Sequence, residues 1–329
     1  MEPQVGFCTT PDGAHIAYAI LGQGSAMVLP PAHFASITPY QTVSEVRHVF
    51  DSLARYHTVV YYDQRGAGLS DRNRTVFTLE SELSDLETVI DHLKLDKMTL
   101  FGAAIAGPIS IAYAAKYTER VTHLILYDTY AYYGKFVSEE FKAALVSLLR
   151  EPDNWLGRRA QISLGVAQGG MDYLDLIAGL IKEVTTSEIA GRITEMAYTL
   201  DITQLCPLIK APTLVMHRKG DLLIDFKAGL ELASLIPKAR FVPLEGDLHY
   251  YILGDTESVL NNIFEFLGDP VPEQSNNDTG KVESLSHLVE PKPEQKKLDW
   301  LRVDNPLVYI IVTIVASVIA GAILTLFKC

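Results

Sequence analysis

The sequence predicts an α/β domain whose mainly parallel sheet is covered by helices on both faces. Over residues 1–268, short runs rich in β-branched residues alternate with amphipathic helical segments, the pattern of strands joined by crossover helices. One stretch, about residues 132–201, keeps only helical periodicity and predicts a helical cap inserted between two strands. The C-terminal part differs in composition, and we divide it into a flexible linker over 269–305 and a transmembrane helix over 306–328.

The predicted sheet has eight strands and begins with a hairpin. The run VGFCTTPDGAHIAYAILG holds two strands and a turn at Pro11-Asp12-Gly13, where proline and glycine favour chain reversal. The remaining strands, in chain order, are AMVLPP, HTVVYYD, KMTLFG, THLILYD, TLVMH and ARFVPL.

Helices are expected between these strands. The helix that starts near Thr78 carries apolar side chains on one face, namely Leu79, Leu83, Leu86, Val89, Ile90 and Leu93. The strand KMTLFG runs directly into a helix of small residues, GAAIAGPISIAYAAKY, and a final helix covers Ser258 to Leu267.

The cap has two interpretations. Helices inserted between parallel strands would lie over the strand ends, which is the edge at which open α/β sheets bind ligands. The side chains near Trp155, Met171, Tyr173 and Leu180 would then either line a pocket or simply pack the cap onto the sheet.

The composition excludes some classes of function. A net charge of −12 argues against a nucleic-acid partner on electrostatic grounds. The three cysteines, Cys8, Cys206 and Cys329, form neither a disulfide framework nor a zinc spacing, which is typical of a reducing compartment. No metal or nucleotide motif is visible, so we expect no cofactor.

The C-terminal tail predicts a single membrane span. Leu307 to Phe327 reads LVYIIVTIVASVIAGAILTLF, 21 residues without a charge, and about 20 apolar residues cross a bilayer core as a helix. The span ends two residues before the chain does, which predicts a tail-anchored protein. Positive residues precede the span at positions 292, 296, 297 and 302, and only Lys328 follows it, so the large domain is expected on the cytoplasmic side.

Several motifs together resemble the α/β-hydrolase family. They are TPDGAHIAY, YYDQRGAGLSDR, LFGAAIAGP with AAKYTERVTHLILY downstream, and HRKGD followed by EGDLH. The motifs also resemble the hydrolase-like domains fused to some bacterial class III adenylate cyclases, and this likeness covers about residues 4–267. The resemblance implies an α/β-hydrolase fold with a nucleophile, an acid and a histidine in that chain order.

The nucleophile position of the family holds alanine. Where the family has Gly-x-Ser-x-Gly on a sharp strand-to-helix turn, this sequence reads Gly102-Ala103-Ala104-Ile105-Ala106. Ala104 offers a methyl group, which has no lone pair to attack a carbonyl carbon. Ser110 is the nearest downstream hydroxyl, but it lies more than a helical turn beyond the elbow. The resemblance also implies backbone oxyanion donors at Ile105 and near Ala32 or His33.

The other two members of the triad are present. Asp221 follows the strand TLVMH where the family places its acid, and His249 lies in GDLHYY where it places its base. Asp128, at the end of LILYD, is a second candidate acid. Asp63, Arg65, Gly66 and Gly68 resemble the family's DxRGxGxS turn and are expected to be structural, and Asp225 is expected to cap the helix that begins near Phe226.

Three functions remain open. The first is a pseudoenzyme that binds a protein or a small apolar or ester-like ligand, for which the membrane tether makes a lipid-derived compound one candidate. The second is an enzyme that uses only the His249–Asp221 pair to deprotonate water or a ligand. The third is an esterase or lipase whose serine has been replaced by Ala104, a substitution that the sequence cannot identify as natural or introduced.

Overall fold

The protein is built around one eight-stranded sheet, described from a computed structural model over residues 1–32, 36–150, 162 and 170–271. The strand order is β1-β2-β4-β3-β5-β6-β7-β8. Strand β2 runs antiparallel to both of its neighbours, and all other neighbouring strands pair in parallel. The bounds are β1 Gln4–Thr9, β2 His15–Leu21, β3 Ser25–Leu29, β4 His57–Tyr62, β5 Met98–Ala103, β6 Val121–Tyr127, β7 Thr213–Arg218 and β8 Arg240–Leu244.

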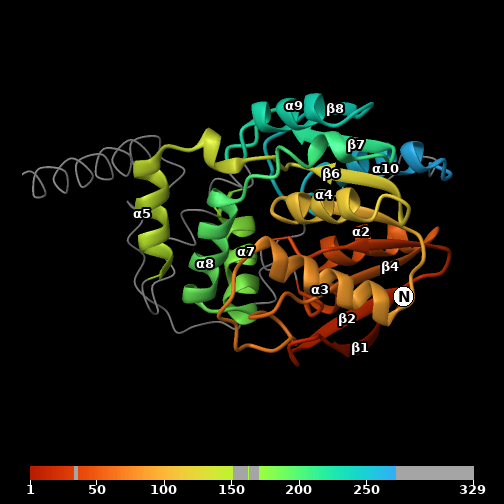
Figure 1. The fold of residues 1–329 in the computed structure, drawn as a ribbon, viewed down its shortest axis with the longest axis horizontal. Helices are drawn as coiled ribbons and strands as arrows, with labels where there is room; N and C mark the ends of the chain where they lie inside the picture. Colours follow the sequence, from red (N-terminus) through yellow and green to blue (C-terminus); the bar gives the residue numbers. More distant parts are fainter. Residues whose placement is uncertain (33–35, 151–161, 163–169, 272–329) are drawn as a thin grey trace, which may run out of the picture. The chain divides into compact units, whose positions relative to one another are not determined.

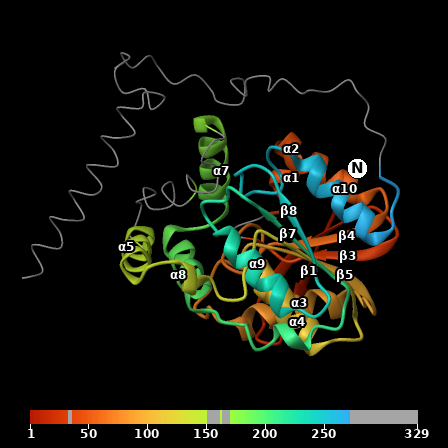
Figure 2. The ribbon, with the colours of Figure 1, turned by 90° about the horizontal axis from the view of Figure 1, so that it is seen from above.

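Helices cover both faces of the sheet, as the alternating pattern predicts (Figures 1 and 2). One face packs against α1 (Pro39–Thr42), α2 (Ser44–Ala54) and α10 (Thr256–Leu267), with apolar side chains such as Phe50 and Phe264 in the contact. The other face packs against α3 (Leu79–His92), α4 (Ala106–Lys116) and α9 (Phe226–Leu235). The predicted mainly parallel sheet is therefore confirmed, and its central strands are buried on both sides.

Capping side chains fix where several helices begin. The Thr78 side chain accepts a hydrogen bond from the Ser81 N–H, and the Ser81 hydroxyl accepts one from the Thr78 N–H, so two free donors at the start of α3 are satisfied. The Asp225 carboxylate accepts from the Lys227 N–H and caps α9, as expected. Helix α10 begins two residues earlier than the sequence predicted, because Asp255 is its N-cap.

Between β6 and β7 the described secondary structure is helical apart from one isolated bridge. The elements are η1 (Tyr133–Phe136), α5 (Glu139–Arg150), α7 (Gly170–Val184), α8 (Ser187–Thr199) and η2 (Cys206–Leu208). An isolated bridge between Tyr132 and Asp201 closes the base of this insertion. Its apolar side chains form a cluster with Ala104 and Ile105 at the end of β5, so these helices pack over the carboxyl end of the sheet. Trp155 and the side chain of Met171 fall outside the described part of the chain.

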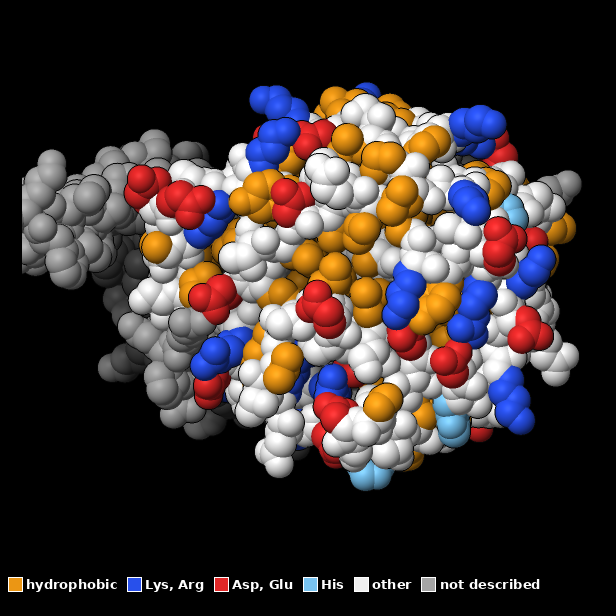
Figure 3. All heavy atoms as spheres, in the orientation of Figure 1, with side chains coloured by type: hydrophobic (Ala, Val, Ile, Leu, Met, Phe, Trp, Pro, Cys, Tyr) orange, Lys and Arg blue, Asp and Glu red, His pale blue; other side chains and the backbone are white. Residues whose placement is uncertain are grey.

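The predicted linker and membrane span lie almost entirely outside the described residues, which end at 271. Within the described ranges, no helix combines the length and the apolar character needed to cross a bilayer. Among the described residues on the face in Figure 3, acidic and basic side chains are interspersed rather than gathered into a field of one sign.

Candidate active site

The elbow keeps its sharp geometry without a serine. Ala104 lies between β5 and α4 with a φ of 47°, a left-handed conformation that non-glycine residues adopt at a cost. Three hydrogen bonds hold it there. The Ala104 N–H donates to the Tyr127 carbonyl at 3.2 Å, and the Ala104 carbonyl accepts from the Gly107 N–H at 3.1 Å and from the Thr129 hydroxyl at 2.6 Å.

Close backbone approach explains the small residues around the elbow. A Cβ atom on Gly102 would lie 2.6 Å from Ser110 Oγ, and one on Gly107 would lie 2.1 Å from Thr129 Oγ1. Both distances are shorter than van der Waals contact allows. The packing of α4 against β5 and the chain after β6 therefore depends on glycine at these two positions.

The acid and the histidine meet as the sequence predicts. His249 Nδ1 lies 2.7 Å from Asp221 Oδ2, and the two residues are each 5% exposed. The other carboxylate oxygen of Asp221 accepts the N–H groups of Leu223 and Ile224, which fixes the carboxylate beside the ring. Burial lowers the pKa of His249, but the charge of Asp221, its hydrogen bond and the charge of Asp128 outweigh burial, so the pKa is raised.

Asp128 is a second carboxylate in the same site. Its Oδ1 accepts the Arg218 N–H at 2.7 Å, while its Oδ2 lies 4.0 Å from His249 Nδ1 and has no hydrogen-bond partner among the described residues. Burial and the neighbouring charge of Asp221 hold the pKa of Asp128 well above its ordinary value. The two acids that the sequence offered as alternatives thus lie side by side, and Asp221 is the direct partner of the imidazole.

A third buried ring lies beneath this pair. His217 Nε2 lies 2.9 Å from the Ile224 carbonyl and 3.8 Å from Asp128. Burial lowers the pKa of His217, which favours its neutral form. Potential metal-ligand atoms of Asp128, Asp221 and His249 lie within 4.8 Å of one another, close enough to bind a metal ion. His249 Nδ1 and Asp221 Oδ2 are, however, already hydrogen-bonded to each other.

A largely apolar cavity of about 110 Å³ lies against His249 and Ala104. Its wall combines residues of α1, α2 and α7 with the end of β5 and the segment 249–252, and Figure 2 shows α7 on the side of the sheet that carries α2 and α10. Leu180, one of the four cap residues considered for a pocket, lines the cavity. Tyr173 instead packs on the apolar cluster of the cap. Ser36 also lines the cavity, although no sequence motif marks this hydroxyl.

Hydroxyls and thiols do not replace the missing serine within the described residues. Ser110 is fully buried and donates to the Ala106 carbonyl at 2.7 Å. The Ser36 hydroxyl faces Asp63 Oδ2 at 3.5 Å. Burial raises the pKa of the Cys8 thiol to about 11 and that of Cys206 to about 12, and both thiols lie in the core away from the cavity. The described structure has no hydroxyl or thiol hydrogen-bonded to His249.

The oxyanion donors are only partly described. Ile105 is fully buried at the start of α4, and its N–H has no acceptor among the described residues. Ala32 lines the cavity, whereas His33 lies outside the described residues. The backbone donor at Ile105 does not depend on a side chain, so the loss of serine leaves it in place.

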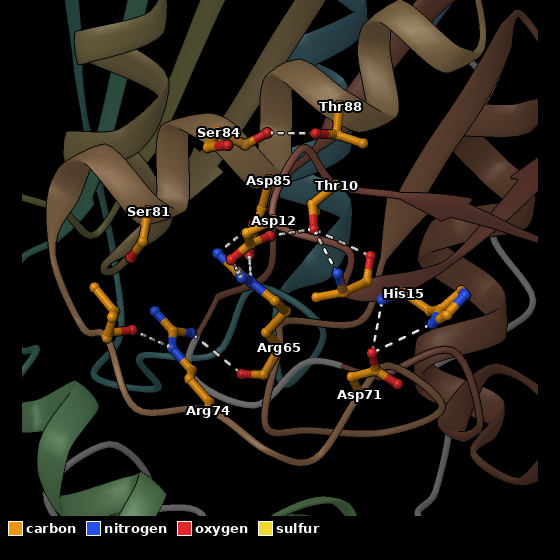
Figure 4. Close-up of polar contacts among 12 residues, drawn as sticks. Thr10, Asp12, His15, Arg65, Asp71, Arg74, Ser81, Ser84, Asp85 and Thr88 are labelled. Atoms are coloured by element: carbon orange, nitrogen blue, oxygen red, sulfur yellow. Dashed lines mark hydrogen bonds and ion pairs between the residues drawn. The ribbon is translucent and has the colours of Figure 1, made fainter.

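The DxRGxG turn is a structural element, as expected. The buried Asp63 carboxylate accepts from the Ile37 N–H at 2.7 Å and the Leu69 N–H at 2.6 Å, and so ties the loop after β3 to the turn after β4. Gly68 has a φ of 56°, and a Cβ there would lie 2.0 Å from Asp63 Oδ2. Figure 4 shows the side chain of Arg65 beside Asp12 and Asp85, with contacts of 2.7 and 2.8 Å.

The chain has the fold of the α/β hydrolases, and a model of the alpha/beta hydrolase fold matches residues 40–169. The chain is 29% identical to a cis-3-alkyl-4-alkyloxetan-2-one decarboxylase from Shewanella oneidensis, over 78% of this chain and 86% of that protein. The enol-lactonase from Burkholderia xenovorans LB400 superimposes with a TM-score of 0.70 at 21% identity, over 80% of this chain and all of that one. The esterase EaEST from Exiguobacterium antarcticum superimposes with a TM-score of 0.71 at 19% identity, over 81% of this chain and all of that one. The likeness to cyclase-fused domains stays a prediction.

Proposed function

We propose that this protein is a hydrolase-like pseudoenzyme that binds a small, largely apolar ligand and does not form an acyl-enzyme. The observation that carries the proposal is Ala104 at an otherwise complete elbow. Covalent acyl transfer needs a nucleophilic atom at that position, and a methyl group supplies none. When such a site loses its nucleophile, the remaining hydrogen-bond donors and substrate binding accelerate the reaction only roughly 10³–10⁴-fold over the rate in water.

The cavity supports a ligand with one polar end. Its wall is mostly aliphatic and aromatic, and His249 supplies a polar group beside the elbow. The relatives favour the same chemistry, because the decarboxylase is named for an alkyl-substituted oxetanone, a cyclic ester, and the lactonase for an enol-lactone. An ester-like or lactone-like ligand with alkyl groups fits both observations.

A second candidate is an enzyme that uses the His249–Asp221 pair without a covalent intermediate. The 2.7 Å contact between the two side chains favours it, because a carboxylate in that place orients the imidazole and stabilises its cation. Histidine would then remove a proton from water or from the ligand itself.

The third candidate is a serine hydrolase in which Ala104 replaces the native serine. The support is the geometry of the elbow, which holds residue 104 at a φ of 47° even without a hydroxyl to present. With alanine at residue 104, no other function of this strained backbone conformation is evident.

One set of variants separates the three candidates. The unaltered chain, Ala104→Ser and His249→Ala are each incubated with a fluorophosphonate probe and with short acyl esters and an alkyl β-lactone. If neither the unaltered chain nor Ala104→Ser is labelled or active, the pseudoenzyme is supported. Turnover by the unaltered chain that disappears in His249→Ala supports the second candidate and contradicts the first. Labelling and turnover by Ala104→Ser alone support the third.

We also propose that the uncharged run from Leu307 to Phe327 attaches the domain to a membrane, with the domain on the cytoplasmic side. The run is long enough to span the hydrocarbon core, and the positive residues before it favour that orientation. Alkaline carbonate extraction of the expressed chain tests the proposal. A variant that ends at residue 275 is the control and should be released into the soluble fraction. Release of the full chain into that fraction would contradict the membrane proposal.

A further inference from the structure

We infer that the outer edge of β1 binds the same edge of a second copy of this chain, so that two sheets join antiparallel about a two-fold axis. Figure 1 shows β1 at one edge of the sheet, and none of its residues lines the cavity at the elbow. The inference therefore goes beyond the proposed ligand binding. It rests in part on the proposed membrane attachment, which would bring the two copies together.

One face of β1 is apolar and open to solvent. Val5 is 44% exposed and Phe7 is 55% exposed, and no other described strand carries an exposed large hydrophobic side chain. Their cross-strand partners in β2 are Ala19 and Ala17, so the two side chains lie on the same face of the sheet. This face of the edge strand is therefore a short apolar stripe without a cover among the described residues.

The backbone groups of every second β1 residue point away from β2. The Thr10 N–H donates to the Ala14 carbonyl at 2.8 Å, so these two residues form a hydrogen-bonded pair at the hairpin turn. Hydrogen-bonded and non-hydrogen-bonded pairs alternate along antiparallel strands. The residues whose N–H and C=O groups face outward are therefore Val5, Phe7 and Thr9, and no described strand lies beyond β1 to pair with them.

The two edges of the sheet differ in how they are protected. The edge strand β8 reads RFVPL, with a charge at Arg240 and a proline at 243, and its two large apolar side chains are partly buried. Charged residues and proline on an edge strand prevent pairing with another chain. Strand β1 reads QVGFCT and has neither a charge nor a proline. The sheet is thus guarded at one edge and open to a further strand at the other.

The geometry of β1 is self-complementary. A two-fold axis perpendicular to the sheet keeps each side chain on its own face, so outward-facing residues must oppose outward-facing residues. With the axis at Phe7, Phe7 of one copy opposes Phe7 of the other, and Val5 opposes Thr9, each pair exchanging both of its hydrogen bonds. An axis at Gly6 would place Pro3 opposite Thr9, and proline has no N–H to donate. The first register is therefore favoured.

Charge and tether length favour a second copy as the occupant. The chain carries a net charge of −12, but residues 3–11 have no charge, so two copies meet there without opposing carboxylates. Pairing of six-residue strands covers less than the roughly 800 Å² per partner of a stable interface. Two copies on one membrane gain effective concentration, because the predicted linker over 272–305 would have a reach of roughly 30–35 Å. A strand of an unrelated soluble protein lacks that gain.

Disulfide trapping of the full chain in phosphatidylcholine vesicles tests the pairing. Three single variants, Phe7→Cys, Val5→Cys and Leu230→Cys, are compared in a Cys329→Ser background, with the two buried cysteines left in place. Leu230 is the control, because it is 45% exposed on α9. Opposed residues of a hydrogen-bonded pair lie about 5.5 Å apart at Cα, within disulfide range, so Phe7→Cys should cross-link at least about 10-fold faster than the other two. The double variant Val5→Cys/Thr9→Cys should match Phe7→Cys.

A lysine at the edge provides a second measurement. Adding Val5→Lys to the Phe7→Cys variant should slow its cross-linking, because a charge guards the strand, whereas adding Leu230→Lys should not. Equal rates for the three single variants would overturn the inference, and so would cross-linking of Val5→Cys as fast as Phe7→Cys, which a two-fold axis at Phe7 forbids. Flotation of the vesicles is scored separately. A chain that does not float with them contradicts the membrane attachment, and trapping of the same variants in concentrated solution then decides the pairing by itself.

Discussion

Arg218 holds the loop that carries His249, and its removal should both destabilise the protein and displace the ring. The side chain is 2% exposed. Its Nε donates to the Tyr127 hydroxyl at 2.8 Å, Nη1 to the Glu245 carbonyl at 2.8 Å and Nη2 to the Asp255 carbonyl at 2.9 Å. Glu245 and Asp255 flank His249 on either side in the chain, so one guanidinium ties together both ends of the loop.

The expected cost of Arg218→Met follows from these contacts. Methionine fills similar space but donates no hydrogen bond, so the buried Tyr127 hydroxyl and the partly exposed Glu245 and Asp255 carbonyls each lose a donor, at about 0.5–1.5 kcal/mol for each hydrogen bond. Together these losses amount to about 3 kcal/mol, which for a domain of this size is a fall in Tm of roughly 10 °C.

The assay is a thermal melt of the full chain in detergent, with Arg240→Met as the matched control. Arg240 pairs with Glu265 at 3.1 Å but is 44% exposed, so the same substitution there should cost less than about 1 kcal/mol. If the two variants melt at the same temperature, Arg218 does not hold the loop and the reasoning fails.

Two further predictions concern packing and pH. Gly107→Ala should destabilise the protein by about 1–3 kcal/mol, because its Cβ would lie 2.1 Å from Thr129 Oγ1. Gly179→Ala is the control, because nothing lies within 4 Å of its new Cβ, and it should stabilise helix α7 by up to about 1 kcal/mol. Urea titrations measure both free energies of unfolding, and a similar effect of the two variants would contradict the packing argument. Burial raises the pKa of Asp85 from 3.8 to about 7 despite its contact with Arg65, so the folded state keeps a proton that the unfolded chain releases. The free energy of unfolding should therefore fall as the pH rises from about 4 to 7, by up to about 1.4 kcal/mol for each pH unit. Asp85→Asn should flatten that dependence. If the variant and the unaltered chain lose stability in parallel as the pH rises, Asp85 is not the group responsible.

Local patterns in the sequence were enough to predict the sheet and its helical layers. Each strand is a short β-branched run, and each covering helix has an apolar face, so the alternation alone indicated a parallel sheet covered on both sides. The start of α10 was misplaced because the Asp255 cap, rather than the apolar periodicity, sets where that helix begins. Arg218 was overlooked, although an arginine at the end of the apolar strand TLVMHR is itself a sign of a buried charge with specific partners.

The sequence by itself determined that residue 104 cannot act as a nucleophile, because the chemistry of a methyl group does not depend on its surroundings. Only the tertiary structure decided that Asp128 and Asp221 both face His249, that Ser36 reaches the cavity, and that one guanidinium ties both ends of the histidine loop. Hydrophobic periodicity encodes which side of an element is buried, not which elements become neighbours. The adjacency of β5, β6 and β7 in the sheet and the conformations of the loops after them bring these distant side chains together.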